Sequence, residues 1–123
     1  MPSQVTRITA GAPVDVEIAG LSNHVLAYRL WFRTAAAADW ALLGEGHTGD
    51  GAADRFALAV PAGRAAQLYY WVGVGNPQLP GSTYRGRITL GQGGRPLDGG
   101  AIDLAGRTDD AGVATQEDWC DVL

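Results

Sequence analysis

The chain has 123 residues, of which 46% are hydrophobic and 18% charged, a composition that excludes a disordered chain and suits a single domain over residues 1–123. Its one cysteine, Cys120, excludes an intrachain disulfide. The net charge of −4 is uneven, because residues 95–123 sum to −5 and residues 1–94 to +1. We therefore expect no nucleic-acid partner, because phosphate binding needs clustered Lys and Arg.

The first half of the chain predicts short antiparallel strands over residues 14–18, 25–33, 40–43 and 56–60. Period-two alternation gives each of the three longer strands an inward apolar face. The predicted inward residues are Val14, Val16, Ile18, Leu26, Tyr28, Leu30, Phe32, Phe56, Leu58 and Val60. Residues 34–39 predict a loop or a single helical turn, because six residues are too few for a stable helix. The Gly- and Asp-rich residues 44–53 predict a turn region, and residues 61–63 predict the end of a strand.

Residues 67–76 form the most aromatic and most strand-prone segment. Leu68, Tyr70, Val72 and Val74 fall on one face, and Tyr69, Trp71 and Gly73 fall on the other. Both faces carry apolar surface, which indicates a central strand of a packed sheet.

Beyond a proline-containing link at residues 76–81, residues 84–90 predict a strand. Its inward residues are Tyr84, Ile88 and Leu90, and its outward residues are Arg85, Arg87 and Thr89. Residues 91–100 predict a turn-rich segment, residues 101–104 a further strand, residues 108–112 a tight turn, and residues 113–123 a last strand. Eight or nine short strands without helical periodicity predict an all-β fold, a single-domain antiparallel β-sandwich of immunoglobulin-like or jelly-roll-like type, with a closed barrel as the alternative.

The last third of the chain resembles two related kinds of module, the bacterial immunoglobulin-like and the carboxypeptidase-regulatory-like (transthyretin-like) modules. The resemblance rests on the turn at residues 94–100, the alternating residues 102–104, and the threonine-aspartate-x-x-glycine turn within residues 108–114. It implies a non-catalytic sandwich that serves as a spacer, adhesion or recognition module. The first 80 residues match no such pattern.

One sheet face is the candidate binding site. If the strands at residues 25–33, 67–76 and 84–90 share a sheet, their outward residues combine arginines and aromatics. These residues are Arg29, Trp31, Arg33, Tyr69, Trp71, Arg85 and Arg87. Because aromatic residues and arginine are enriched at interface cores, the predicted partner is another protein or a second copy of the chain. A carbohydrate is the alternative ligand, stacking on Trp31, Tyr69 and Trp71, although Asn76 is the one evident amide beside that strand.

Metal and nucleotide sites find little support. Residues 44–49 match the G-x-G-x-x-G pattern, but a strand rather than a helix follows, which favours a turn. His47, Asp50 and Asp54 are weak candidate metal ligands, since a metal takes three or four. Asp109 and Asp110 offer too few oxygens for calcium and suit turn capping better. We therefore expect no cofactor and no metal.

Catalytic patterns are also weak. Ser22 and Ser82 lack the glycine context of a nucleophile elbow, and acidic neighbours oppose formation of a Cys120 thiolate. A carboxylate near His24 or His47 cannot be read from the sequence. We therefore expect a binding or structural module and not an enzyme.

The N-terminal residues show no basic segment followed by an apolar run, and no apolar run could span a bilayer. We therefore expect a soluble protein that has no membrane partner. The expected location is cytoplasmic, or exported by a non-classical route.

Overall fold

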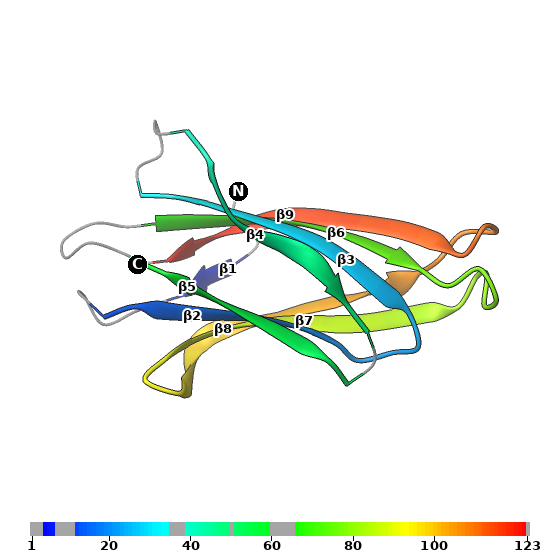
Figure 1. Cartoon of the computed structure of the whole chain (residues 1–123), viewed down its shortest axis with the longest axis horizontal. Coiled ribbons are helices and arrows are strands. Elements are labelled where there is room, and N and C mark those ends of the chain that lie inside the picture. The colour runs from blue at the N-terminus through cyan, green and yellow to red at the C-terminus, as the bar shows by residue number, and fades with distance from the viewer. Residues whose placement is uncertain (1–3, 7–11, 35–38, 50, 60–65, 123) are drawn as a thin grey trace.

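The structure is a computed structural model that describes residues 4–6, 12–34, 39–49, 51–59 and 66–122. Within these residues the chain is all-β, with nine strands in two sheets that pack face to face, which confirms the predicted antiparallel β-sandwich (Figure 1). The strands are β1 (Gln4–Thr6), β2 (Val14–Gly20), β3 (Val25–Arg33), β4 (Ala41–Thr48), β5 (Ala53–Leu58), β6 (Ala66–Gly75), β7 (Thr83–Gln92), β8 (Arg95–Arg107) and β9 (Val113–Val122).

One sheet has five strands in the order β1-β9-β6-β3-β4, and the other has four in the order β5-β2-β7-β8. The short β1 runs parallel to β9, and all other neighbours are antiparallel. The aromatic strand β6 lies in the middle of the larger sheet, as its two apolar faces predict. The two layers are seen from the side in Figure 1, with β3, β4, β6 and β9 above and β2, β5, β7 and β8 below.

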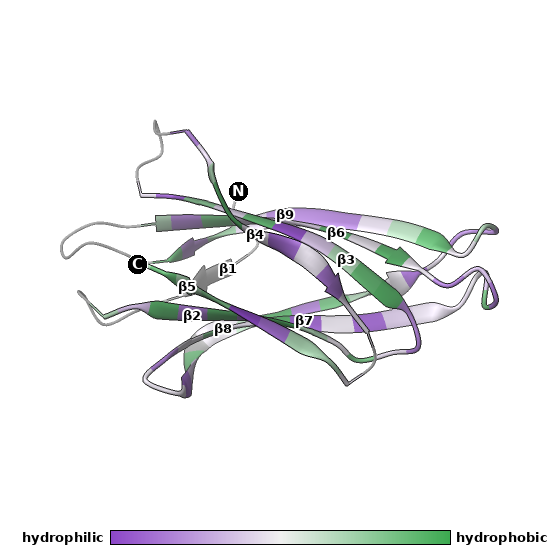
Figure 2. Cartoon of the chain, viewed as in Figure 1, coloured by the Kyte–Doolittle hydropathy of each residue, from purple (hydrophilic) through white to green (hydrophobic). Residues whose placement is uncertain are grey.

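The core lies between the layers and follows the predicted alternation. Every second residue is buried throughout β2 and β6, as far as Leu30 in β3 and as far as Leu90 in β7. Figure 2 shows the resulting bands of contrasting hydropathy along the strands. The largest fully buried side chains include Tyr70, Leu30, Leu68, Ile18 and Ile88. Burying a side chain of this size contributes about 1.5–3 kcal/mol each, so these strands hold the two sheets together.

The predicted turn region at residues 44–53 is wrong in its first half, because β4 continues to Thr48. Two of the glycines that suggested a turn instead make room for aromatic rings of the core. A Cβ on Gly44 would lie 2.3 Å from the ring of Phe56, and one on Gly46 would lie 2.9 Å from the Tyr28 hydroxyl. The G-x-G-x-x-G pattern at residues 44–49 therefore lies in an edge strand and its end.

The predicted turn-rich segment at residues 91–100 is also mostly strand. β7 continues to Gln92 and β8 begins at Arg95, so only Gly93 and Gly94 form the turn, with φ angles of 60° and 78°. Two adjacent residues with positive φ produce the tight hairpin connection whose twist matches that of the flanking strands.

The tight turn at residues 108–112 is confirmed. Oδ1 of Asp109 accepts hydrogen bonds from the backbone N–H groups of Ala111 and Val113, both at 2.9 Å. Gly112 closes the turn with a φ of 77°. Predictions for residues 35–38, 50 and 60–65 lie outside the described residues.

Candidate binding face

Three neighbouring strands build one continuous surface on the outside of the five-stranded sheet. In β3, β6 and β9 alternate residues point away from the core, and the strand register aligns them in rows across the sheet. We call three of these rows the aromatic face: Arg29, Trp71 and Glu117; Trp31, Tyr69 and Trp119; and Arg33, Gln67 and Asp121. The first five residues predicted for the binding face, from Arg29 to Trp71, are therefore brought together.

All four tryptophans of the chain lie on this side of the sandwich. Trp31, Trp71 and Trp119 belong to the rows, and Trp40, which precedes β4, places its ring 5.8 Å from the ring of Tyr69. Each of the four is half-buried. Tryptophan combines a large apolar area with a polar N–H group, which is why it is enriched where proteins meet their partners.

The rings form a connected cluster around Tyr69. Its ring centroid lies 5.4 Å from that of Trp31, at a tilt of 54°. The guanidinium carbon of Arg33 lies 4.2 Å from the ring centroid of Trp40, a cation–π distance. The cluster is held by contacts within the sheet and does not depend on a ligand.

Charged side chains flank the rings in a regular way. Nε of Arg29 lies 3.1 Å from Oε2 of Glu45 on β4, and the Tyr69 hydroxyl donates a hydrogen bond to Glu117. In the third row Arg33 donates to Gln67 at 2.7 Å, and Gln67 donates to Asp121 at 3.1 Å. The face is therefore basic along β3 and acidic along β9.

The Tyr69–Glu117 hydrogen bond changes the chemistry of the phenol. It raises the pKa of Tyr69 to about 12, with burial and the negative charge of Glu117 adding to the effect. Tyr69 therefore stays protonated and remains a hydrogen-bond donor at any physiological pH.

A shallow hollow of about 290 Å³ lies at the centre of the aromatic face. It is lined by Arg29, Trp31, Tyr69, Trp71 and Glu117. Trp71 lies against the strand, because a Cβ on Gly73 would come within 2.7 Å of its ring. The hollow combines apolar rings with one cation and one carboxylate, which suits recognition of a partly polar surface.

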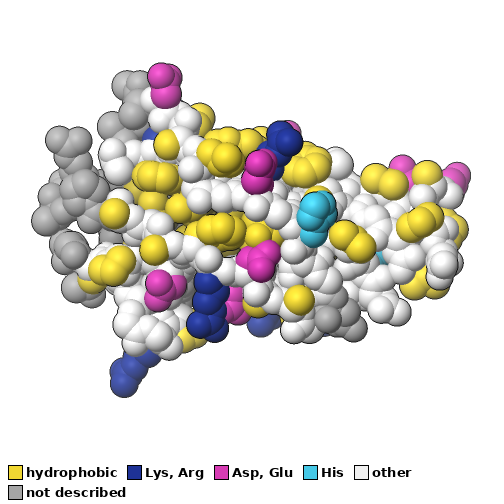
Figure 3. All heavy atoms as spheres, viewed as in Figure 1, with side chains coloured by type: hydrophobic (Ala, Val, Ile, Leu, Met, Phe, Trp, Pro, Cys, Tyr) yellow, Lys and Arg dark blue, Asp and Glu magenta, His cyan; other side chains and the backbone are white. Residues whose placement is uncertain are grey.

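Exposed aliphatic side chains extend the apolar surface beyond the rows. Val25 and Val113 face each other across Gly75 at one end of β3, β6 and β9, and they are 57% and 48% exposed. Leu42, opposite Trp31 on β4, is 53% exposed. Figure 3 shows hydrophobic side chains along the upper margin of the molecule, where this side of the sandwich is seen edge-on.

The placement of Arg85 and Arg87 on the same face is wrong. Their strand, β7, belongs to the four-stranded sheet and pairs with β2 and β8. Both arginines therefore lie on the outer face of that sheet, on the opposite side of the sandwich from the aromatic face. Alternation predicted correctly that they face outward. It contains no information about which sheet a strand joins.

The sequence prediction missed five residues of the site: Trp40, Gln67, Glu117, Trp119 and Asp121. The last three depend on β9 pairing with β6, a contact between segments about 50 residues apart in the sequence. The alternation of Glu117, Trp119 and Asp121 was a signal for one outward face of a strand, but the choice of neighbour was not readable.

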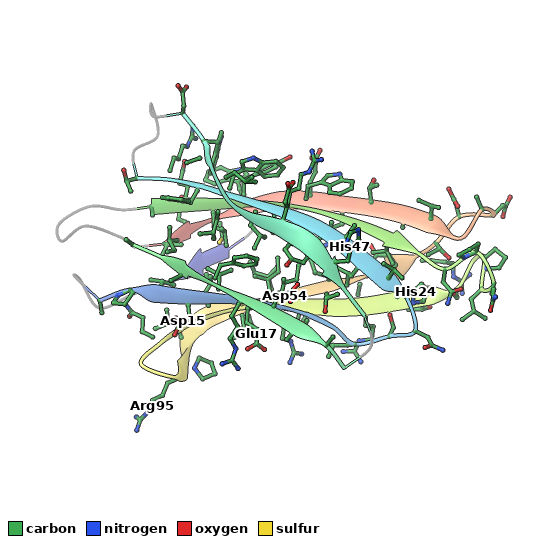
Figure 4. The ribbon with its side chains drawn as sticks, in the orientation of Figure 1. Asp15, Glu17, His24, His47, Asp54 and Arg95 are labelled. Atoms are coloured by element: carbon green, nitrogen blue, oxygen red, sulfur yellow. The ribbon has the colours of Figure 1, made fainter. Side chains whose placement is uncertain are left out.

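The outer face of the four-stranded sheet differs in character. It carries ion pairs between Arg55 and Glu17 at 2.7 Å and between Arg87 and Asp103 at 3.0 Å, separated by small residues. A hollow of about 310 Å³ beside the β7–β8 hairpin is lined by residues that include Asp15, Glu17 and Arg95, which Figure 4 labels. This face resembles an ordinary solvated surface.

The weak metal candidates do not converge. His47 points outward from β4, whereas Asp54 lies between the sheets and accepts a hydrogen bond from the Tyr28 hydroxyl at 2.5 Å (Figure 4). Asp50 lies outside the described residues. Among the residues that the structure describes, no group of three or more His, Cys, Asp and Glu side chains could hold a metal ion.

The structure brings His24 between Ser22 and Ser82, which the sequence did not predict. The Ser22 hydroxyl lies 2.9 Å from Nδ1, and the Ser82 hydroxyl lies 2.9 Å from Nε2. Ser82 donates its own hydrogen to the carbonyl of Leu79 at 2.5 Å, so Nε2–H must be the donor to Ser82. His24 therefore joins two loops, and in this arrangement it is not placed to take a proton from Ser82.

Cys120 is buried at the inner face of β9. Burial and the nearby charge of Asp121 raise the pKa of its thiol to about 12. A thiol with so high a pKa is a poor nucleophile.

Comparisons with protein-family models, with curated proteins and with solved structures find no match to this chain. The resemblance of residues 94–114 to immunoglobulin-like and transthyretin-like modules stays a prediction. In the described part of the chain, no helix is long and apolar enough to cross a membrane.

Proposed function

We propose that the protein is a non-catalytic binding module and that the aromatic face contacts another protein. The observation that carries this proposal is the gathering of all four tryptophans on one outer sheet face. Contiguous apolar patches are uncommon on the free surface of a monomer unless they have a use. The outer face of the four-stranded sheet is charged and solvated, which also favours the aromatic face as the binding site.

The composition of the face suits a protein partner. Interface cores are enriched in Trp, Tyr and Arg, and the aromatic face combines these residue types around one hollow. The exposed side chains of Val25, Leu42 and Val113 add apolar area at its margins. The raised pKa of the Cys120 thiol and the direction of the His24 hydrogen bonds favour binding over catalysis.

The test is a comparison of binding by the wild type, Trp71→Ala and Arg87→Ala, with circular dichroism to confirm the fold. Immobilised wild type should retain a defined protein partner, including its own chain, and Trp71→Ala should lose at least about tenfold in affinity, as for an interface hot spot. Arg87→Ala, on the opposite sheet, should bind like the wild type. Retention of binding by Trp71→Ala together with its loss in Arg87→Ala would contradict the proposal.

A carbohydrate is the second candidate ligand, and one observation favours it. Glu117 and Arg29 line the same hollow as Trp31, Tyr69 and Trp71, so groups that bond sugar hydroxyls lie beside rings that stack on sugar faces. Tryptophan fluorescence that is quenched by a glycan in the wild type, but not in Trp71→Ala, would support this candidate. A glycan array without signal would argue against it.

A further inference from the structure

We infer, resting on the proposed binding face, that its partner is a second copy of this chain, related to the first by a twofold axis that runs along β6. Closed twofold dimers are the most common protein assemblies, and they need a surface that is complementary to itself. The order of residues across the aromatic face meets this requirement in one orientation.

Consider a twofold axis that lies between the two faces and runs parallel to β6. Rotation about it moves each residue to the other side of β6 but leaves its position along the strands unchanged. The β3 residues of one copy therefore lie over the β9 residues of the other, row by row. The resulting pairs are Val25 with Val113, Ala27 with Thr115, Arg29 with Glu117, Trp31 with Trp119, and Arg33 with Asp121. Four of these pairs are apolar with apolar or basic with acidic, and the fifth sets Ala27 against the uncharged side chain of Thr115. Each pair occurs twice.

The other face-to-face arrangement places the axis across the strands. It would set β3 over β3 and β9 over β9, so that Arg29 meets Arg33 and Glu117 meets Asp121. Like charges placed together at an interface are unfavourable by several kcal/mol. The separation of basic residues on β3 from acidic residues on β9 therefore selects the axis along β6.

The existing ion pair of Arg29 leaves room for this contact. The side chains of Arg29 and Glu45 are 60% and 55% exposed, so the guanidinium can bond a second carboxylate while it keeps the first. The ladder from Arg33 through Gln67 to Asp121 likewise fixes its charges in place before association. Prepositioned side chains lose less conformational freedom on binding.

The size of the face lies at the lower end of the standard range. The four longer strands, β3, β4, β6 and β9, lie about 4.8 Å apart and are about 30 Å long, which gives a projected area of roughly 600 Å². Stable interfaces bury about 600–1,000 Å² on each partner. Packed sheets cross at about 30°, so the row matches hold best near the centre, where Arg29, Trp31 and their counterparts lie.

Charge reversal tests this arrangement by sedimentation velocity. The wild type should sediment as a dimer, and Arg29→Glu and Glu117→Arg should each raise the dimer dissociation constant by at least about tenfold, because each homodimer then contains two like-charged contacts. Mixing the two variants should restore the dimer, since a heterodimer contains one native and one reversed pair. Arg87→Glu is the matched control, because Arg87 is also exposed and paired with a neighbouring carboxylate, but on the opposite sheet.

The outcomes separate this inference from the proposed function. The mixture of Arg29→Glu and Glu117→Arg could stay monomeric while Trp71→Ala abolishes dimer formation. That result would contradict the twofold axis along β6, but it would still support the aromatic face as the binding site. A wild type that is monomeric at every concentration would overturn the inference, and the partner and glycan tests would then decide the proposed function. A dimer that is dissolved by Arg87→Glu and not by Arg29→Glu would overturn both.

Discussion

Tyr69 connects the aromatic and the acidic parts of the face through its hydrogen bond to Glu117. We expect difference titration of the wild type against Tyr69→Phe, followed by phenolate absorbance, to give Tyr69 a pKa of about 12, above the ordinary value of 10.0. Glu117→Gln removes the charge and weakens the hydrogen bond, so the pKa should fall toward 10.0. An unchanged titration in Glu117→Gln would contradict the assigned cause.

The raised pKa of Tyr69 also makes the stability of the fold depend on pH. Because the pKa is higher in the folded state than in the unfolded chain, folding favours the protonated phenol. The stabilisation from this group is fully present below pH 10 and is lost as the pH rises toward about 12. Tyr69→Phe should therefore flatten the fall in stability over this alkaline range, as measured by urea unfolding.

His24 is a second residue whose environment sets its role. It is 5% exposed, and both of its ring nitrogens have hydroxyl partners in separate loops. His24→Ala should lower the free energy of unfolding by about 1–3 kcal/mol, because it leaves buried hydrogen-bonding groups without partners. His47→Ala, at an exposed position, should change it by less than about 0.5 kcal/mol. Equal effects in urea denaturation would show that His24 does not join the loops.

At the scale of elements, Gly112 controls how the β8–β9 turn packs against the end of β6. Its carbonyl accepts a hydrogen bond from the backbone N–H of Asn76 at 2.8 Å, and a Cβ at Gly112 would lie 2.3 Å from the Asn76 carbonyl oxygen. The substitution Gly112→Ala therefore combines an unfavourable φ with a backbone clash.

Gly81→Ala provides the matched comparison for this turn. Gly81 also has a positive φ, 70°, but its Cβ would meet nothing within 4 Å. We expect Gly81→Ala to cost about 1–2 kcal/mol from φ alone and Gly112→Ala to cost more. Similar midpoints of thermal unfolding for the two variants would contradict a role for the close approach to Asn76.

Alternation predicted the strands that have one buried and one outward face. In β2, β3, β6 and β7 the inward residues are those expected, because a period of two leaves no other way to bury the apolar set. Glycine was the main source of error. The sequence predicts Gly44 and Gly46 as turn residues, but they make space for the rings of Phe56 and Tyr28. The need for that space arises only when β5 and β3 pack beside β4.

The candidate site was predictable to the same extent. Arg29, Trp31, Arg33, Tyr69 and Trp71 lie on two strands that are also paired in the structure, so assuming one sheet was correct for them. The same assumption failed for Arg85 and Arg87, because β7 joins the other sheet. Glu117 and Trp119 could not be added without knowing that β9 pairs with β6.

At the scale of the whole molecule, the sandwich has two unlike outer surfaces. One is charged and carries small residues, and the other carries all four tryptophans, with basic residues on β3 and acidic residues on β9. Because the proposed pairs are charged and near the surface, raising the ionic strength should weaken self-association, whereas the apolar contacts should persist. The proposal therefore assigns contact with solvent to one outer surface and self-association to the other.

The most direct measurement is acrylamide quenching of intrinsic tryptophan fluorescence against protein concentration, with the mass of the same samples followed by light scattering. All four tryptophans lie on the aromatic side, so the signal reports on that side alone. Quenching should fall as the mass doubles, and Arg29→Glu should keep the monomer's quenching throughout. A mass that doubles without any change in quenching, or a wild type that never doubles, would contradict the association of this face with its own copy.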